Sequence, residues 1–164
     1  MRTIKFKGKC IGPEHKDKTV CGSLLTSPDG TVRIFEHDHD TIFNYFTVDP
    51  KTVCQFIGFT DKNGKEIYEC DVLRSDGYPY SCFEDEERDN YFAVVFYCED
   101  GASFATVTAK NPESNVGGIS DGICNDVSRD EMKRFEVVGN IHEEKWQQYG
   151  EYFKTEEGKE ADND

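Results

Sequence analysis

Cysteine and histidine side chains are the residues of this 164-residue chain that are best suited to chemistry. A thiolate can act as a nucleophile or a metal ligand, and an imidazole can act as a base or a metal ligand. An odd number of cysteines cannot close completely into internal disulfides, and no two of these form a C-x-x-C pair. We therefore expect a reducing compartment and thiols that are mostly small, buried hydrophobic groups. The seven cysteines lie at positions 10, 21, 54, 70, 82, 98 and 124.

The run His37-Asp38-His39-Asp40 is the most compact group of metal-ligand residue types. Two imidazoles two residues apart share a face of an extended chain, so a weak metal site is conceivable. No third ligand can be assigned from the sequence, and the run lies between expected strands, where turns need polar groups. We therefore expect an ordinary polar loop, and no bound cofactor.

Three carboxylates, Glu66, Glu69 and Asp71, are also close in sequence. A carboxylate pair without a recognisable cleft is weak support for acid–base catalysis. We expect these groups to lie at a rim or to bind turn amides.

A Cys/His nucleophile is a second catalytic arrangement that stays open, with Cys82 or Cys124 as the thiol and His142 as the base. Nothing in the sequence places these residues together. The sequence also lacks a serine elbow, an H-E-x-x-H motif, a phosphate loop and a dinucleotide fingerprint. We therefore predict a protein that is not an enzyme.

The elements that would position these groups are arranged around residues 56–73, which predict a strand, a turn and a second strand. The turn centres on Asn63-Gly64, a pair suited to positive φ at both central positions. A second hairpin is predicted around Ser-Pro-Asp-Gly at 27–30, and a third around 99–101. Further strands are expected at 2–7, 42–48, 71–74 and 135–141, and helical segments at 49–53, 128–133 and 140–153.

The central stretch also carries a family resemblance. Gly58, the run 61–69 and Asp71-Val72 are similar to the central signature of the YopX-like family of phage and prophage proteins. The opening residues 1–7 and the segment 136–143 are similar to the start and the closing strand of that family. The resemblance implies a phage origin and an SH3-like β-barrel core, and it implies no catalytic residue set.

The resemblance implies glycine at two positions where this chain has cysteine, Cys54 and Cys70. If the backbone needs a positive φ there, a side chain adds strain. We therefore expect these tight turns to be locally reshaped.

Length and composition favour one mainly β domain. Twelve Phe and eight Tyr in a 36% hydrophobic chain indicate an aromatic-rich β interior. We predict a single domain over residues 1–154, with an SH3-like β-barrel core, an additional N-terminal β-layer and a short C-terminal helix. Residues 155–164 form an acidic tail that we expect to be disordered.

The net charge of −14 makes non-specific binding to nucleic acid unlikely on electrostatic grounds, so we expect no direct nucleic-acid partner. Residues near the N-terminus alternate in charge and lack a hydrophobic signal core, and no run approaches membrane-spanning length. We expect a protein of the bacterial host cytoplasm that does not bind membranes.

The predicted function is recognition of a protein partner by a non-enzymatic accessory protein. Aromatic residues dominate binding energy at interfaces, and several lie in the long loop at 75–90 beside an acidic run. Trp146 belongs to a narrow apolar stripe that we expect either to pack on the barrel or to face a partner. The predicted partner-binding residues are Tyr78, Tyr80, Phe83, Glu84, Glu86 and Trp146.

Three other functions stay open. The acidic loop and tail could imitate nucleic acid and occupy a basic host protein. A small enzyme could use a cysteine or a metal ion, and an uncovered strand edge could support self-association into a homo-oligomer.

Overall fold

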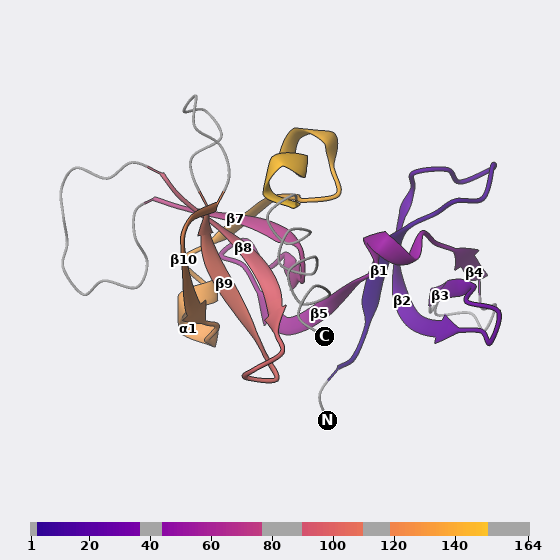
Figure 1. Ribbon diagram of the computed structural model, residues 1–164, viewed down its shortest axis with the longest axis horizontal. Coiled ribbons are helices and arrows are strands. Elements are labelled where there is room, and N and C mark those ends of the chain that lie inside the picture. The colour runs from indigo at the N-terminus through magenta and orange to yellow at the C-terminus, as the bar shows by residue number, and fades with distance from the viewer. Residues whose placement is uncertain (1–2, 37–43, 77–89, 110–118, 151–164) are drawn as a thin grey trace, which may run out of the picture. The chain divides into compact units, whose positions relative to one another are not determined.

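The computed structural model describes residues 3–36, 44–76, 90–109 and 119–150, with only the backbone described in 119–126. It is mainly β, which confirms the predicted class, and its strands form two antiparallel sheets. The chain divides into two compact units, residues 1–58 and residues 59–164. In Figure 1 the colour follows the residue number, so the first unit begins in indigo and the second ends in yellow. Whether the two units form one folding domain over 1–154 stays a prediction.

The first sheet has six strands in the order β4-β3-β2-β1-β5-β6, with β6 (Glu66–Tyr68) at its edge, and the antiparallel strands β1 to β5 lie wholly or mostly in the N-terminal unit. A short 3₁₀ helix precedes β5 and confirms the predicted turn at 49–53. Its cap is the predicted one: the Lys51 N–H donates to Asp49 Oδ1 at 3.0 Å, with Pro50 in the first position. The elements are β1 (Phe6–Lys9), β2 (Thr19–Thr26), β3 (Val32–Glu36), β4 (Asn44–Thr47), η1 (Pro50–Thr52) and β5 (Cys54–Thr60).

The hairpin between β2 and β3 forms where the sequence predicts it. The Gly30 N–H donates to the Ser27 carbonyl at 2.9 Å, and Gly30 has a φ of 82°, which glycine adopts without steric cost. The Thr31 N–H donates to Asp29 Oδ1 at 2.9 Å and completes the turn. The local chemistry of this turn therefore sets the register of the two strands.

One face of this curved sheet encloses a small core. The sheet curls so that the end of β4 reaches the end of β1, where the Ile11 N–H donates to the Thr47 carbonyl at 3.0 Å. A single bridge between Cys10 and Val48 accompanies it. The barrel is not closed, and its SH3-like character stays a prediction. The core consists of Cys10, Val20, Val32, Ile34 and Val48, with Phe6, Leu24, Phe46 and Val53 packed against it.

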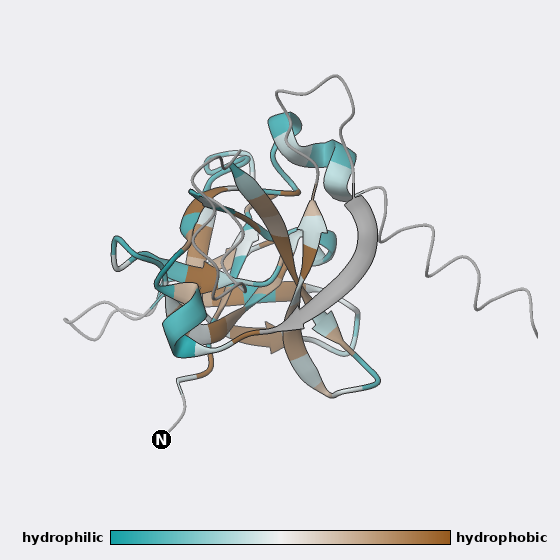
Figure 2. Ribbon diagram, turned by 90° about the vertical axis from the view of Figure 1, so that its left-hand side faces the viewer, coloured by the Kyte–Doolittle hydropathy of each residue, from teal (hydrophilic) through white to brown (hydrophobic). Residues whose placement is uncertain are grey.

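The C-terminal unit contains a second sheet in the order β10-β9-β8-β7-β11. Figure 2 shows hydrophobic residues along the strands and hydrophilic residues in the turns and the short α1. The Glu131 N–H donates to Ser128 Oγ at 3.3 Å, which confirms the Ser128 cap of the capping-box pattern predicted before α1. The elements are β6 (Glu66–Tyr68), β7 (Asp71–Ser75), β8 (Tyr91–Cys98), β9 (Ser103–Ala109), β10 (Ile119–Asp126), α1 (Arg129–Met132), β11 (Glu136–Asn140) and η2 (Glu144–Trp146).

The central hairpin between β5 and β6 is present, but its turn differs from the expected one. Gly64 has a φ of 82°, whereas Asn63 is not among the described residues with positive φ. The reason is Asp61, whose buried Oδ1 accepts the N–H groups of Asn63 and Lys65 at 2.8 and 2.9 Å. The Asp61 carboxylate therefore organises the turn, and one positive φ is enough to reverse the chain.

The C-terminal helix is short, as predicted, and begins later than expected. The 3₁₀ segment η2 begins at Glu144, and residues 147–150 are helical where the described chain ends. Asn140 is the last residue of β11 rather than a helix cap. No helix among the described residues is long and apolar enough to cross a membrane.

Candidate functional site

Most of the predicted partner-binding residues lie outside the described residues. This applies to Tyr78, Tyr80, Phe83, Glu84 and Glu86, and also to the run His37 to Asp40. Their roles stay predictions.

Trp146 is the one predicted partner residue that the structure describes, and it lies in the core of the C-terminal unit. Its side chain is 3% exposed and stacks on Tyr149 with ring centroids 5.9 Å apart. The ring of Phe92 lies 6.3 Å away, and Gly139 leaves the space for the indole because a Cβ there would overlap Trp146 Nε1. Of the two roles expected for this stripe, the structure supports packing, and we do not carry Trp146 into the partner surface.

A different apolar surface is present on the N-terminal unit. On the side opposite to its core, Leu25 pairs with Arg33 and then Thr47 across three strands, and Ser23 pairs with Phe35 and then Tyr45. We call these six residues the outer face. Leu25 is 48% exposed and Tyr45 is 61% exposed, and the rings of Phe35 and Tyr45 lie 5.8 Å apart. An aliphatic residue, two aromatic rings and an arginine on one surface have the composition of an interface.

The outer face ends at β4, which is the edge strand in the sheet order. The Thr47 carbonyl accepts a bond from Ile11, so the peptide groups of Thr47 point away from β3. Because peptide directions repeat every two residues in a strand, those of Tyr45 also point outward. An extended segment could therefore add to β4 at Tyr45.

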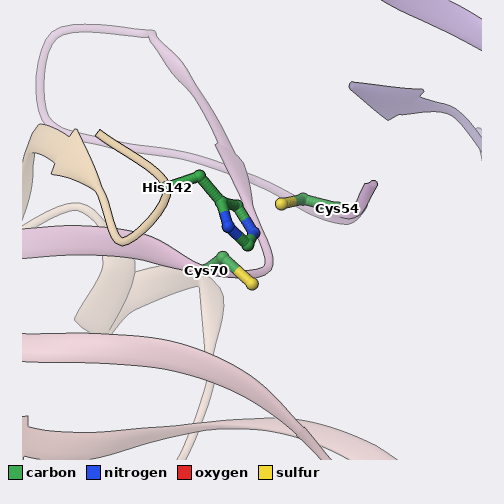
Figure 3. A group of neighbouring side chains, drawn as sticks. All are labelled: Cys54, Cys70 and His142. Atoms are coloured by element: carbon green, nitrogen blue, oxygen red, sulfur yellow. The ribbon is translucent and has the colours of Figure 1, made fainter. Parts of the chain in front are cut away.

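Two half-buried residues of the C-terminal unit, Cys70 and His142, bring a thiol and an imidazole close together (Figure 3). The Cys70 sulfur and a ring nitrogen of His142 lie within 4.8 Å of each other. Cys70 precedes β7 and His142 follows β11, and these strands are antiparallel neighbours. The Ile141 N–H donates to the Cys70 carbonyl at 3.0 Å and holds the two turns together.

The buried carboxylate of Asp71 fixes both turns. Its Oδ2 accepts the Tyr68 N–H at 2.8 Å, and its Oδ1 accepts the Asn140 side-chain amide at 3.0 Å. Asn140 Oδ1 in turn accepts the His142 N–H at 3.1 Å. This confirms that a carboxylate of the cluster at 66–71 binds a turn amide, and it explains why the two reactive groups have defined positions.

Cys70 has a φ of 66°, as expected for a position where the family resemblance implies glycine. A non-glycine residue in this region costs about 1 kcal/mol or more of backbone strain. Cys54 does not share this feature, because it begins the extended strand β5, and it is not among the described residues with positive φ. The expectation of strain is therefore confirmed at Cys70 and wrong at Cys54.

The other described thiols partly fit the expectation of small buried groups. Cys10 and Cys54 are buried, Cys98 is intermediate and Cys21 is exposed, and none of these four forms a disulfide. Burial raises the pKa of the Cys10 thiol above its ordinary value, although Lys18 opposes the effect. Cys54, labelled in Figure 3, is the first residue of β5 in the N-terminal unit, and its sulfur donates to the Thr52 carbonyl at 3.4 Å.

Sequence reasoning left open a pairing of His142 with Cys82 or Cys124, whose side chains are not described, and it missed Cys70. The missing information was the pairing of β7 with β11, which joins residues 62 to 69 positions apart. The available signal was the cysteine at an expected glycine position.

Residues 15–145 match the family described as YopX protein. Comparison with curated proteins gives no match.

Proposed function

The chain belongs to the YopX protein family, and from this premise we propose that it is a non-enzymatic phage or prophage accessory protein that recognises a protein partner in the cytoplasm of the bacterial host. The observation that carries the proposal is the outer face of the N-terminal unit, where Leu25 on β2 and Tyr45 on β4 are largely exposed on either side of β3, which contributes Arg33 and Phe35. Exposed apolar residues that cluster, unlike single ones, mark interaction sites.

The occupant that fits this surface is an extended segment of the partner that carries acidic side chains. The outward peptide groups of Tyr45 offer main-chain hydrogen bonds to such a segment. Arg33 lies between Leu25 and Thr47 in its row, and the outer face as defined here holds no carboxylate. The face is therefore complementary to negative charge even though the whole chain carries a net charge of −14.

The test is partner capture from nuclease-treated host lysate, read by mass spectrometry, with wild-type protein and two variants. The double variant Leu25→Ala/Tyr45→Ala removes the exposed side chains of the outer face. Tyr97→Ala is the matched control, because Tyr97 is 44% exposed and lies in the C-terminal unit. A protein that wild type and Tyr97→Ala retain and the double variant loses would support the proposal.

The aromatic residues of the loop at 75–90 are a second proposed contact, and the same capture tests them. Tyr78→Ala/Tyr80→Ala should weaken retention without lowering the melting temperature if these rings bind the partner. Equal retention by all four proteins would overturn both surfaces.

Imitation of nucleic acid is the competing function that a specific observation favours. Residues 59–164 contain twenty-six acidic and eleven basic side chains, whereas residues 1–58 contain seven and eight. A decoy predicts capture of a basic protein only at low salt, because exposed charges are screened as ionic strength rises. It also predicts loss of capture when residues 84–87 are neutralised, with the outer-face variants unaffected.

A further inference from the structure

We propose that Cys70 and His142 of the C-terminal unit bind a transition-metal ion of the zinc class. The inference goes beyond partner recognition and does not depend on it. It begins from the donor atoms, since the Cys70 sulfur and a His142 ring nitrogen lie within 4.8 Å of each other (Figure 3).

The donor types select the ion. Thiolate and imidazole are the ligands that zinc prefers, at about 2.3 Å and about 2.0 Å. Donors on one tetrahedral ion are therefore roughly 3.5 Å apart, which a small rotation of either side chain achieves from the observed positions. Both residues are half-buried, with the His142 Nε2 atom itself inaccessible to solvent, and water can fill the remaining coordination positions of an ion held there.

The backbone positions of both ligands are already fixed. The Cys70 N–H donates to the Val95 carbonyl at 2.8 Å, and its carbonyl accepts from Ile141. The His142 backbone is held by Asn140, which is held by the buried carboxylate of Asp71. A site built on fixed strand ends loses little conformational freedom when it binds an ion, and the binding step releases the thiol proton to solvent.

The backbone conformation of Cys70 allows a substitution that removes the thiol without disturbing the fold. Its φ of 66° is one that glycine adopts freely, so Cys70→Gly removes the thiol and relieves backbone strain in the same step. Loss of binding in this variant cannot be attributed to unfolding if its melting temperature is unchanged or raised.

The experiment is a titration of reduced, metal-free full-length protein with Zn²⁺ and, separately, with Co²⁺. Calorimetry and the melting temperature report binding of Zn²⁺, and the thiolate-to-cobalt charge-transfer absorption reports whether sulfur is a ligand. Cys70→Gly and His142→Gln are compared with the control variants Cys98→Ser and Cys21→Ser, which remove thiols from the same unit and from the other one.

We expect wild type and both control variants to bind Zn²⁺, to melt at higher temperature with it and to give the cobalt–thiolate absorption. Cys70→Gly and His142→Gln should each lose affinity at least tenfold. The Cys70→Gly variant should also lose the cobalt–thiolate absorption. The proposal is overturned if wild type shows no binding, or if both site variants bind Zn²⁺ as wild type does.

Discussion

The two units of this chain have the same connectivity and use it differently. Each has five strands in which the fifth returns to pair with the first, and each has a short helix just before that strand, η1 before β5 and α1 before β11. The run β4-β3-β2-β1-β5 of the first sheet corresponds strand by strand to β10-β9-β8-β7-β11, and β6 is an additional strand of the first sheet. Differences between the two units therefore arise from their side chains and not from the connectivity of these strands.

The units differ in where they place aromatic side chains. The N-terminal unit has an aliphatic and cysteine core and leaves Tyr45 exposed, whereas the C-terminal unit buries Phe92, Trp146 and Tyr149 together. The same connectivity thus accepts a small core with an open outer face or a larger core filled with rings. Among the described residues, the N-terminal unit has the exposed apolar outer face, and the C-terminal unit has the aromatic core.

The largest expected loss of stability comes from removing a side chain from the aromatic core of the C-terminal unit. Trp146→Ala should lower the free energy of unfolding of the C-terminal unit by about 3–5 kcal/mol, because it removes a buried indole and leaves a cavity between Phe92 and Tyr149. Urea unfolding followed by circular dichroism measures the change. Tyr97→Ala, which removes a partly exposed ring of the same unit that contacts Phe104, is the control and should cost only about 1 kcal/mol.

Amide hydrogen exchange in the Trp146→Ala variant tests whether the two units unfold separately or together. If they unfold separately, exchange in β2 and β3 will keep its wild-type rate while exchange in β8 and β9 accelerates. Faster exchange in all four strands would support the predicted single domain over 1–154. A loss of stability below about 1 kcal/mol would contradict the core role of Trp146.

The sequence predicted the features that depend on neighbouring residues. The turn at 27–30, the cap at Asp49 and the cap at Ser128 are all present, because each is held by hydrogen bonds that span four positions or fewer. The positive φ at Cys70 was also predicted, from a family pattern rather than from spacing.

The features that the sequence did not predict depend on distant pairing. The strand at 71–74 was expected to begin a single barrel, whereas the pairings of β1 with β5 and β7 with β11 give each unit its own sheet connectivity. The burial of Trp146 depends on Gly139, since only a residue without a side chain leaves room for the indole. The meeting of Cys70 and His142 depends on the β7–β11 register, which no local pattern encodes.

A smaller expected effect is a dependence of the stability of the C-terminal unit on pH. Burial raises the pKa of Tyr149 to about 12, from an ordinary value near 10. The unfolded chain therefore ionises first, so stability that is fully present below about pH 10 is lost as the pH rises towards 12. We expect a loss of about 1–2 kcal/mol after allowance for solvent screening, measured by urea unfolding at several alkaline pH values.

Tyr149→Phe is the matched control, because it keeps the ring in the core and removes the titrating hydroxyl. The difference between wild type and this variant cancels the titration of all other groups. A difference that does not change with pH between about 10 and 12 would show that Tyr149 does not link pH to stability.

The smallest effects compare one left-handed residue in each unit. Ala102 in the β8–β9 turn has a φ of 46°, and Asp17 before β2 has a φ of 64°. Alanine is strained in this region, whereas aspartate tolerates it because its side chain can form local hydrogen bonds. Glycine relieves the strain but gives the unfolded chain more freedom, and the two effects oppose each other. We therefore expect Ala102→Gly to stabilise by about 0.5 kcal/mol and Asp17→Gly to change stability by less, or to lower it slightly. Urea unfolding curves of each variant and wild type measure both changes. A larger gain in stability for Asp17→Gly than for Ala102→Gly would mean that strain in this turn, rather than the size of the core, limits the stability of the N-terminal unit.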